Sequence, residues 1–321
     1  MKAPRTLQEA IIHFADADNC IAYMVAHRWP EGVECPTCGR KDVSYLANQK
    51  KWQCKSGHAK RQFTCKVGTI FEDSALGLET WLPAVWIITA AKNGVSSCEI
   101  ARSLDVTQKT AWFMLHRIRK AMANGSMMKL GGNGGGEVEA DETFIGGKAR
   151  NMHVSKRERR ITGTGGKDKI AVMGLLERGG QVRATVISSR KRQVLHAEVK
   201  KHVEAGSALY TDALLSYQGL GADYVHAVVD HAVEYVNGRI HTNGLENFWS
   251  LLKRGINGTY VSIEPFHLFR YLDEQTFRYN NRATKDNPLT DSDRFSAVLS
   301  QVTGKRLTYA EVTGKVGETI N

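Results

Sequence analysis

The 321-residue sequence has no apolar stretch long enough to cross a bilayer, which excludes a transmembrane helix. Proline is scarce, with six residues, and this excludes a collagen-like chain. The N-terminal segment lacks the continuous apolar region of a signal peptide, so we expect a cytoplasmic protein. Acidic residues are outnumbered, with 33 Asp and Glu against 44 Lys and Arg and a net charge of +11. This excess favours a polyanionic partner, most often nucleic acid.

The remaining composition is that of a folded protein. Hydrophobic residues make up 42% and charged residues 24%, which excludes a mainly disordered chain. The length favours two or three domains over one. The glycine-rich segment Gly131–Gly136 predicts a flexible break and a domain boundary. It does not fit a phosphate-binding loop, because no Gly-Lys-Ser/Thr follows it.

Cysteines cluster near the N-terminus and predict a metal site. Cys35 and Cys38 form a C-P-x-C-G turn, whose glycine lets backbone amides curl round a thiolate. Cys54 supplies a third thiolate, and either His58 or Cys65 is the fourth ligand. Thiolate and imidazole suit tetrahedral zinc, and clustered cysteines in a cytoplasmic chain bind metal more often than they form disulfides. We predict one structural Zn²⁺ held by Cys35, Cys38, Cys54 and His58, with no open position for chemistry.

Two helices joined by a tight turn are predicted between residues 96 and 122. A serine at 96 or 97 can cap the first helix, and Thr107 can cap the second after a break at 105–106. This order is typical of a helix-turn-helix, whose second helix reaches base edges with its first residues. Those first residues are Gln108, Lys109 and Thr110. Arg117, further along the same helix, is expected to contact phosphates. The alternative is a plain helical hairpin that packs on a neighbouring domain.

Beyond the glycine-rich segment the pattern changes to strands. We expect strands at 137–145, 170–176, 181–187, 208–211 and 224–229, and helices at 194–205 and 245–252. The order is therefore strand, hairpin, helix, strand, strand, helix. This is the element order of an RNase H-like domain, so we expect a multidomain α/β protein with a mixed-sheet catalytic domain.

Three acids occupy the places where an RNase H-like domain gathers its carboxylates. Asp141 lies on the first strand, Asp212 directly after the fourth, and Glu246 on the later helix. Phosphodiester cleavage needs an activated water or hydroxyl and a stabilised leaving oxygen, and two divalent ions can serve both oxygens. Hard carboxylate oxygens suit Mg²⁺ or Mn²⁺, and three acids without metal would repel one another. We predict two Mg²⁺ or Mn²⁺ ions per active site; each acid alone would fit an ordinary surface carboxylate.

A strongly basic loop, residues 148–169, separates the first two predicted strands. It holds eight Lys or Arg against Glu158 and Asp168. Side chains without a regular scaffold suit phosphates better than base edges, so we expect general DNA affinity from this loop. The residues assigned to DNA contact are Lys148, Arg157, Arg159 and Arg160.

Several blocks together resemble a known family. They are CPTCG from Cys35, KVGTIFEDS from Lys66, TAWFMLHRIRKAM from Thr110, EADETFIGGK from Glu139, YTDALLSY from Tyr210, HTNGLENFWSLLKRGINGTY from His241 and FRYNNR from Phe277. Over nearly its whole length the sequence resembles the zinc-ribbon insertion-sequence transposases with a DDE-type domain, bacterial relatives of the Merlin elements. The resemblance implies cleavage of double-stranded DNA at transposon terminal repeats and transfer of the 3′-hydroxyl to target DNA. It also implies a homodimer or higher multimer in the bacterial cytoplasm.

The resemblance also assigns roles to residues on the later helix. The family's three acids fall on the triad named above. Some relatives have Asn as the third catalytic residue, and Asn243 is nearby; we prefer Glu246, because a carboxylate is a better Mg²⁺ ligand than an amide. Lys253, two helical turns beyond Glu246, and the adjacent Arg254 are expected to contact DNA.

Two features of the resemblance leave a choice open. The family's ribbon often has C-x-x-C in its second half, but Gly57 stands at the second cysteine position here, so His58 or Cys65 has to complete the site. Arg278, Asn280 and Arg282 match a family motif without an obvious role. They either bind DNA or lock the last helix in place.

These patterns divide the chain into segments and leave three classes of function. The expected segments are an N-terminal helical segment at 1–30, a zinc ribbon at 31–75, a helix-turn-helix domain at 76–130, an RNase H-like DDE catalytic domain at 137–285 and a C-terminal extension at 286–321. A transposase is the leading prediction. The alternatives are an RNase H-like nuclease without strand joining, and a non-catalytic DNA-binding regulator, against which the acid triad argues.

Overall fold

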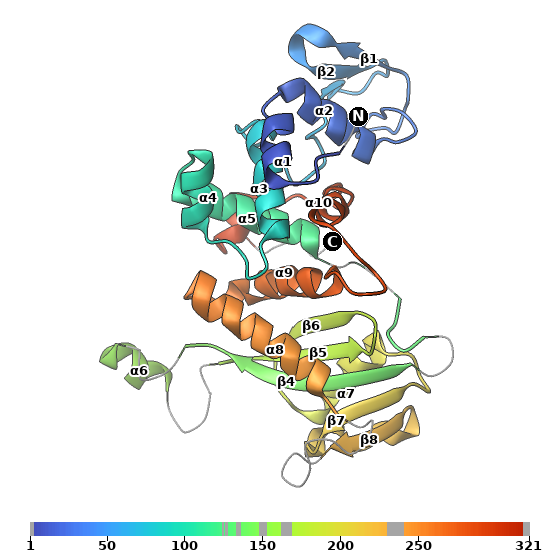
Figure 1. The fold of residues 1–321 in the computed structure, drawn as a ribbon, viewed down its shortest axis with the longest axis vertical. Helices are drawn as coiled ribbons and strands as arrows, with labels where there is room; N and C mark the ends of the chain where they lie inside the picture. The colour runs from blue at the N-terminus through green and yellow to red at the C-terminus, as the bar shows by residue number, and fades with distance from the viewer. Residues whose placement is uncertain are drawn as a thin grey trace. The chain divides into compact units, whose positions relative to one another are not determined.

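The computed structural model describes residues 3–123, 125, 128–132, 136–147, 153–161, 169–229 and 241–316, without the side chains of residues 156, 159, 160 and 229. The chain divides into two compact units (Figure 1). Unit 1 contains residues 1–123 and 281–321, and unit 2 contains residues 124–280. No helix in the described part of the chain is long and apolar enough to cross a membrane.

Unit 1 is mainly helical, and its core combines both ends of the sequence. Its helices are α1 (Leu7–Phe14), α2 (Ala17–Arg28), α3 (Leu78–Ala90), α4 (Ser97–Leu104), α5 (Gln108–Met122), α10 (Asp291–Leu299) and α11 (Tyr309–Val312). The fully buried ring of Phe295 on α10 lies 5.6 Å from Phe14, 5.8 Å from Tyr23 and 5.0 Å from Trp86. The segment 286–321, expected as a separate extension, is therefore part of unit 1.

Three short antiparallel strands form the ribbon of unit 1. They are β1 (Val43–Leu46), β2 (Lys51–Cys54) and β3 (Gln62–Phe63), in the order β1-β2-β3. Trp52 and Phe63 share one face, and Trp29 packs on both at ring distances of 5.9 and 6.1 Å. Because side chains alternate along a strand, Gln53 and Gln62 lie together on the opposite face.

The short helix, turn and longer helix between residues 96 and 122 are present as α4 and α5. Ser96 forms a capping box with Glu99 at the start of α4. Asp105 has a left-handed backbone conformation, with φ of 50°, and ends α4. The Thr107 side chain accepts a hydrogen bond from the Thr110 N–H and begins α5. Local sequence signals therefore fix both helix boundaries.

Unit 2 is built on a five-stranded mixed sheet of order β6-β5-β4-β7-β8. Its elements are β4 (Glu137–Ile145), α6 (Val154–Arg160), β5 (Ile170–Glu177), β6 (Val182–Ile187), α7 (Arg192–His202), β7 (Ala208–Asp212), β8 (Val225–Val229), α8 (Asn243–Gly255) and α9 (Leu268–Asn280). The strands β4, β5 and β6 pair antiparallel, whereas β7 pairs parallel with both β4 and β8. The predicted order of strands and helices is thus present, with α6 and α9 in addition.

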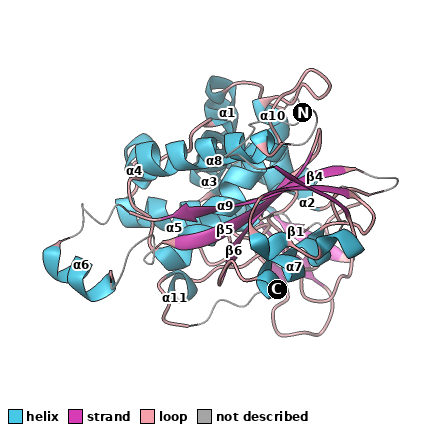
Figure 2. Ribbon diagram, turned by 90° about the horizontal axis from the view of Figure 1, so that it is seen from below, coloured by secondary structure: helices cyan, strands magenta, loops and turns pink. Residues whose placement is uncertain are grey.

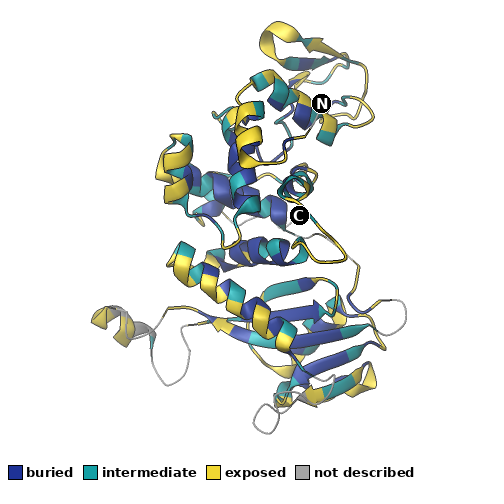
Figure 3. Cartoon of the chain, in the orientation of Figure 1, coloured by how far each residue is buried: buried dark blue, intermediate teal, exposed yellow. Residues whose placement is uncertain are grey.

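Helices cover both faces of this sheet (Figure 2). Leu195 and Val199 of α7 join Val138 and Ala140 of β4 in one apolar core, and α8 and α9 form the other core with Val172 and neighbouring residues. The middle of the sheet is accordingly buried (Figure 3). Since Val138 and Ala140 face α7, the alternate positions Glu139 and Asp141 face α8.

The last helix of unit 2 is locked to the sheet edge by its final residue. The Asn280 amide accepts a hydrogen bond from the Val182 N–H at 2.8 Å and donates one to the Val182 carbonyl at 3.0 Å. Arg278 forms an ion pair with the buried Glu274 one turn earlier. Of the two roles left open for Arg278 and Asn280, these contacts favour locking the helix over binding DNA.

Candidate active site and zinc cluster

Two of the predicted acids lie side by side because of strand register. In the parallel pairing of β4 with β7, Ala140 is opposite Thr211, and Asp141 and Asp212 follow these paired residues directly. Residues at matching positions of adjacent strands point to the same face, and the strands are about 4.8 Å apart. The two carboxylates therefore sit on neighbouring strands, both on the α8 side of the sheet.

Glu246, on α8, lines a cavity of about 520 Å³ that Asp141 also lines. The cavity is lined by Asp141, Glu142, Thr143, Glu246, Trp249, Ser250 and Lys253. The four helical residues have the spacing i, i+3, i+4 and i+7, which places them on one helix face. Asp212 does not line the cavity, but its negative charge acts on both Asp141 and Glu142, so it lies nearby.

Asn243, the other candidate for the third catalytic residue, lies at a different place on α8. It is exposed at the first position of the helix and is absent from the cavity lining. Glu246 both lines the cavity and raises the pKa of Asp141 through its charge. The geometry therefore favours Glu246.

The environment of Asp141 resists ionisation in the absence of a cation. Burial raises the pKa of Asp141 to about 6, and the charges of Asp212 and Glu246 add to this rise. The Trp249 indole opposes it by donating a hydrogen bond to Asp141 Oδ2 at 2.9 Å. A divalent cation would remove the repulsion, so the donor set fits Mg²⁺ or Mn²⁺.

A fourth carboxylate, Glu142, was missed from the sequence. Burial, together with the charges of Asp212 and Asp141, raises the pKa of Glu142 to about 7. The buried Tyr217 donates a hydrogen bond to Glu142, and the nearby Arg190 counteracts the shift. The only sequence signal was its position beside Asp141 on the same strand.

A buried carboxylate anchors the start of α8. Glu139, 1% exposed, lies two residues before Asp141 and accepts a hydrogen bond from the Leu245 N–H at 3.0 Å. Arg178 donates to the same carboxylate at 3.0 Å, and His241 lies 3.4 Å from it. A Cβ at Gly244 would come 2.8 Å from Glu139 Oε2, so glycine permits this approach. The contact fixes the backbone one residue before Glu246.

The helix also approaches the sheet closely at Gly174, the residue of β5 opposite Asp141. A Cβ at this position would come 2.6 Å from the Trp249 ring and 2.8 Å from Leu245. Glycine therefore lets the indole lie against the sheet, where its N–H reaches Asp141.

In unit 1, the four predicted zinc ligands converge. The donor atoms of Cys35, Cys38, Cys54 and His58 all lie within 4.8 Å of one another. Cys38 Sγ is 3.6 Å from Cys54 Sγ, and His58 Nε2 is 3.3 Å from Cys35 Sγ. Ligands at about 2.0–2.3 Å from a tetrahedral Zn²⁺ have separations of this size, so the donor set fits zinc.

The other candidate for the fourth ligand, Cys65, is not part of this cluster. Burial raises its pKa to about 11, which keeps the thiol protonated. The cluster cysteines do not share one direction, because a hydrogen bond with Ser56 lowers the pKa of Cys38 to about 7 whereas burial raises the pKa of Cys35. Geometry therefore decides the choice, and it favours His58 over Cys65.

Two family models match the two regions just described. The ISXO2-like transposase domain matches residues 133–280, and the transposase zinc-ribbon domain matches residues 15–66. Together they cover more than half of the chain. The chain thus carries an ISXO2-like transposase domain and a transposase zinc-ribbon domain. It is also similar to a protein in the transposable element ISH50 of Halobacterium salinarum, with 29% identity over 243 residues, or 72% of this chain and 80% of that protein.

The two transposase domains imply DNA binding. The α5 residues expected on base edges make contacts within unit 1. Gln108 donates a hydrogen bond to the Ser97 hydroxyl at 2.8 Å, and the Lys109 ammonium lies 4.8 Å from the centre of the Tyr309 ring. Thr110 shares a hydrogen bond with Thr107. Gln108 and Lys109 are exposed, so the first turn of α5 remains available to DNA.

The prediction that Arg117 contacts phosphates is wrong, because Arg117 lies in the core of unit 1. It is 3% exposed, its guanidinium lies 5.3 Å from the rings of both Trp81 and Phe113, and it donates a hydrogen bond to the Glu72 carbonyl. A side chain enclosed in this way does not reach a phosphate. Arginine on a helix was interpreted as a surface residue, and only tertiary packing reveals otherwise.

The remaining residues assigned to DNA have different outcomes. Lys253 lines the acid cavity, and Arg254 is exposed beside it on α8. Arg157 is exposed on α6, within the segment expected as an irregular loop. Lys148 and the side chains of Arg159 and Arg160 lie outside the described residues.

Proposed function

We propose that this protein is a DDE-type transposase that cleaves phosphodiester bonds at the ends of its element and transfers the 3′-hydroxyl to target DNA. The observation that carries the proposal is the approach of Asp141 and Glu246 in one cavity beside Asp212. The five-stranded order β6-β5-β4-β7-β8 supports the RNase H-like assignment, and the family match supports transposition.

Asp141, Asp212 and Glu246 would hold the divalent cations of the reaction. When bound, two Mg²⁺ ions supply an activated oxygen nucleophile and stabilise the leaving oxygen. Trp249 keeps one Asp141 oxygen oriented, and the Glu142 N–H donates to the other at 2.8 Å. Both contacts limit carboxylate rotation, so the site is arranged before substrate arrives.

Lys253 provides the cation that faces the substrate. It lines the same cavity as Asp141 and lies two helical turns from Glu246. An ammonium at this position can hold a non-bridging phosphate oxygen next to the bond that is cut. The acids and the lysine therefore divide the site into a metal-binding side and a phosphate-binding side.

The other parts of the proposal concern assembly and recognition. Cleavage of two element ends and joining to one target require more than one active site, so we propose a homodimer or higher multimer on double-stranded DNA in the cytoplasm. The α4–α5 helix-turn-helix would contribute to recognition of terminal repeats through Gln108, Lys109 and Thr110. The zinc would hold the ribbon and take no part in chemistry.

The proposal is tested with purified full-length protein and DNA containing the element's ends. Asp141→Asn and Asp212→Asn should each abolish Mg²⁺-dependent cleavage while DNA binding survives. Asp223→Asn is the matched control, because Asp223 is exposed and pairs with Lys200 away from the cavity. Full cleavage by either active-site variant would overturn the assignment.

A second assay separates a transposase from a nuclease of the same fold. Pre-cleaved ends with a free 3′-hydroxyl are incubated with wild-type protein, Mg²⁺ and supercoiled target DNA. A transposase joins the end to the target, whereas a nuclease leaves the target unjoined.

A further inference from the structure

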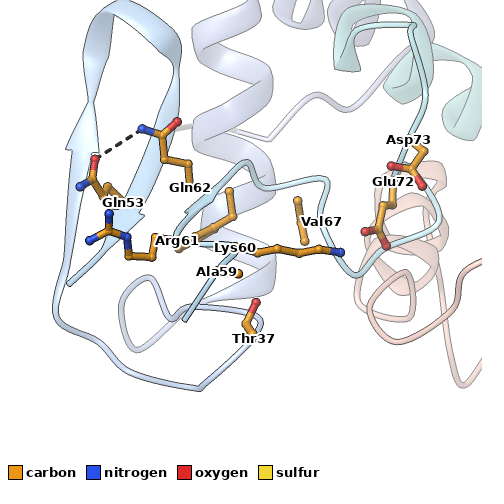
Figure 4. A pocket seen from close by; sticks show the side chains of 10 residues that line it. Thr37, Gln53, Ala59, Lys60, Arg61, Gln62, Val67, Glu72 and Asp73 are labelled. Atoms are coloured by element: carbon orange, nitrogen blue, oxygen red, sulfur yellow. Dashed lines mark hydrogen bonds between the residues drawn. The ribbon is translucent and has the colours of Figure 1, made fainter. Parts of the chain in front are cut away.

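The outer face of the ribbon presents a row of hydrogen-bonding side chains. In the antiparallel register, Ser44 on β1 is opposite Gln53 on β2, and Gln53 is opposite Gln62 on β3. Residues directly opposite one another have Cβ atoms about 4.5–5.5 Å apart on the same face. Gln62 donates a long, weak hydrogen bond to Gln53 Oε1 at 3.5 Å, so the two amides lie together (Figure 4).

Two cations border this row. Lys60 and Arg61 precede β3, are exposed and have no ion pair with a carboxylate among the described residues. Three other lysines of the ribbon differ, because Lys41, Lys50 and Lys55 pair with Glu34, Asp18 and Asp42. Lys60 and Arg61 are thus available to an anionic partner.

The amides and cations share a recess of about 510 Å³, whose far side carries Glu72 and Asp73 (Figure 4). These two acids would repel DNA if their charges were uncompensated. Arg306 forms ion pairs with both, and the Glu72 carboxylate accepts a hydrogen bond from the Gly68 N–H. Arg306 therefore offsets one of the two negative charges, and the two positive charges of Lys60 and Arg61 leave the recess with a net positive charge.

We propose that this outer ribbon face is a sequence-reading surface for duplex DNA, with Gln53 and Gln62 on base edges and Lys60 and Arg61 on phosphates. The inference rests on the proposed function, which requires the protein to find the ends of its element. A side-chain amide presents a donor and an acceptor together, the pattern that adenine offers in the major groove. That groove admits a two-stranded β-ribbon.

Contacts within α4 and α5 strengthen the case for a reader on the ribbon. The Gln108 amide at the start of α5 already donates to Ser97, and Lys109 lies against Tyr309. On the ribbon, by contrast, Gln53 and Gln62 bond weakly and only to each other among the described residues. The ribbon would read one part of the terminal sequence and α5 another.

The test uses full-length protein carrying Asp141→Asn, without added Mg²⁺, so that binding is measured apart from cleavage. Each protein selects duplexes from a random-sequence pool, and the bound DNA is sequenced. Gln53→Ala and Gln62→Ala should each relax adjacent base positions of the selected motif, with discrimination reduced about tenfold. Gln108→Ala should relax different positions.

The cations are tested by the salt dependence of binding to a selected duplex. Replacing Lys60 and Arg61 together with Ala should lower the slope of log affinity against log salt by about two units, with the motif unchanged. Lys41→Ala is the matched control, because Lys41 is an exposed ribbon lysine outside the recess that pairs with Glu34. Zinc content per chain verifies that every variant keeps the ribbon folded.

Several outcomes overturn the inference. One is that the amide variants select the same motif as the parent with zinc retained. A second is that the parent enriches no sequence, and a third is that the double variant keeps its salt slope. Cleavage of element ends by the wild-type chain is measured separately, so the proposed function can stand while the ribbon surface fails.

Discussion

The zinc cluster and the acid cluster differ in how far apart in the sequence their members lie. His58 and Cys35, whose side chains meet in the zinc cluster, are 23 residues apart, and a short hairpin brings them together. Trp249 and Asp141 are 108 residues apart, and the contact between them requires the paired sheet and a helix laid across it. The zinc cluster is a local construction, and the acid cluster depends on all of unit 2.

The two clusters also differ in what they do without metal. The zinc cluster has four protein donors within 4.8 Å, enough to close a tetrahedral site. The acid cluster lines an open cavity, and burial and mutual repulsion raise the pKa of Asp141. The closed set of zinc ligands stabilises a fold. The open cavity, lined by carboxylates that repel one another, leaves room for a substrate. This contrast predicts different responses to mutation.

The largest expected effect is on the zinc side. Cys35→Ser should lose the metal and unfold the ribbon, because the binding free energy of a structural zinc, about 10 kcal/mol or more, is folding free energy. Elemental analysis and circular dichroism measure both changes. Cys98→Ser, at an exposed cysteine outside the cluster, is the control. Wild-type protein without zinc would contradict the prediction. Loss of zinc in Cys65→Ser but not in His58→Ala would show that Cys65, not His58, is the fourth ligand.

The next effect concerns the anchor of α8 in unit 2. Glu139→Ala leaves the half-buried Arg178 without its nearest carboxylate and removes the acceptor of the Leu245 N–H, a loss of about 3–5 kcal/mol in unfolding free energy. Glu139→Gln keeps an acceptor for that N–H and should lose less. Urea denaturation measures both. Equal stability of wild type and Glu139→Ala would show that α8 is held by its apolar face alone.

A smaller effect distinguishes the two candidates for the third catalytic residue. Glu246→Gln should slow cleavage at least about 100-fold, the upper end of what changes beside a metal ligand cost. Asn243→Ala should slow it less than about tenfold, because this side chain is not part of the cavity lining. Single-turnover cleavage rates measure both. The reverse ranking would make Asn243 the catalytic residue.

The last effect is a pH dependence of stability without divalent metal. The folded-state pKa values of Asp141 and Glu142, about 6 and about 7, lie above those of the unfolded chain. The folded state therefore binds more protons, so stability is greatest below about pH 4 for these groups and is lost as the pH rises through 6 and 7. From these pKa values the decline is about 3 kcal/mol for each group at most, and Mg²⁺ should oppose it. Asp141→Asn should remove the part near pH 6 in urea titrations at each pH.

Local signals in the sequence predicted most of unit 2. The strand 137–145 coincides with β4, because alternation and the following glycines define both of its ends. The helix α10 was missed, although Thr290 and Asp293 form a capping box that is visible in the sequence. Its burial comes from Phe295 packing on Phe14 and Trp86, residues far away along the chain. Such contacts leave no local periodicity from which to predict them.

The sequence by itself determined the kinds of ligand, the C-P-x-C-G turn, the order of strands and the family, since these depend on residue types and local spacing. Only the tertiary structure decided that His58 rather than Cys65 joins the zinc cluster, that Asp141 and Asp212 share a sheet face with α8, and that Arg117 is buried. The physical reason is that strand register and burial are set by packing between segments distant in the chain. A buried arginine and an exposed one cannot be distinguished in the sequence, because the difference lies in the neighbours that tertiary packing brings to them.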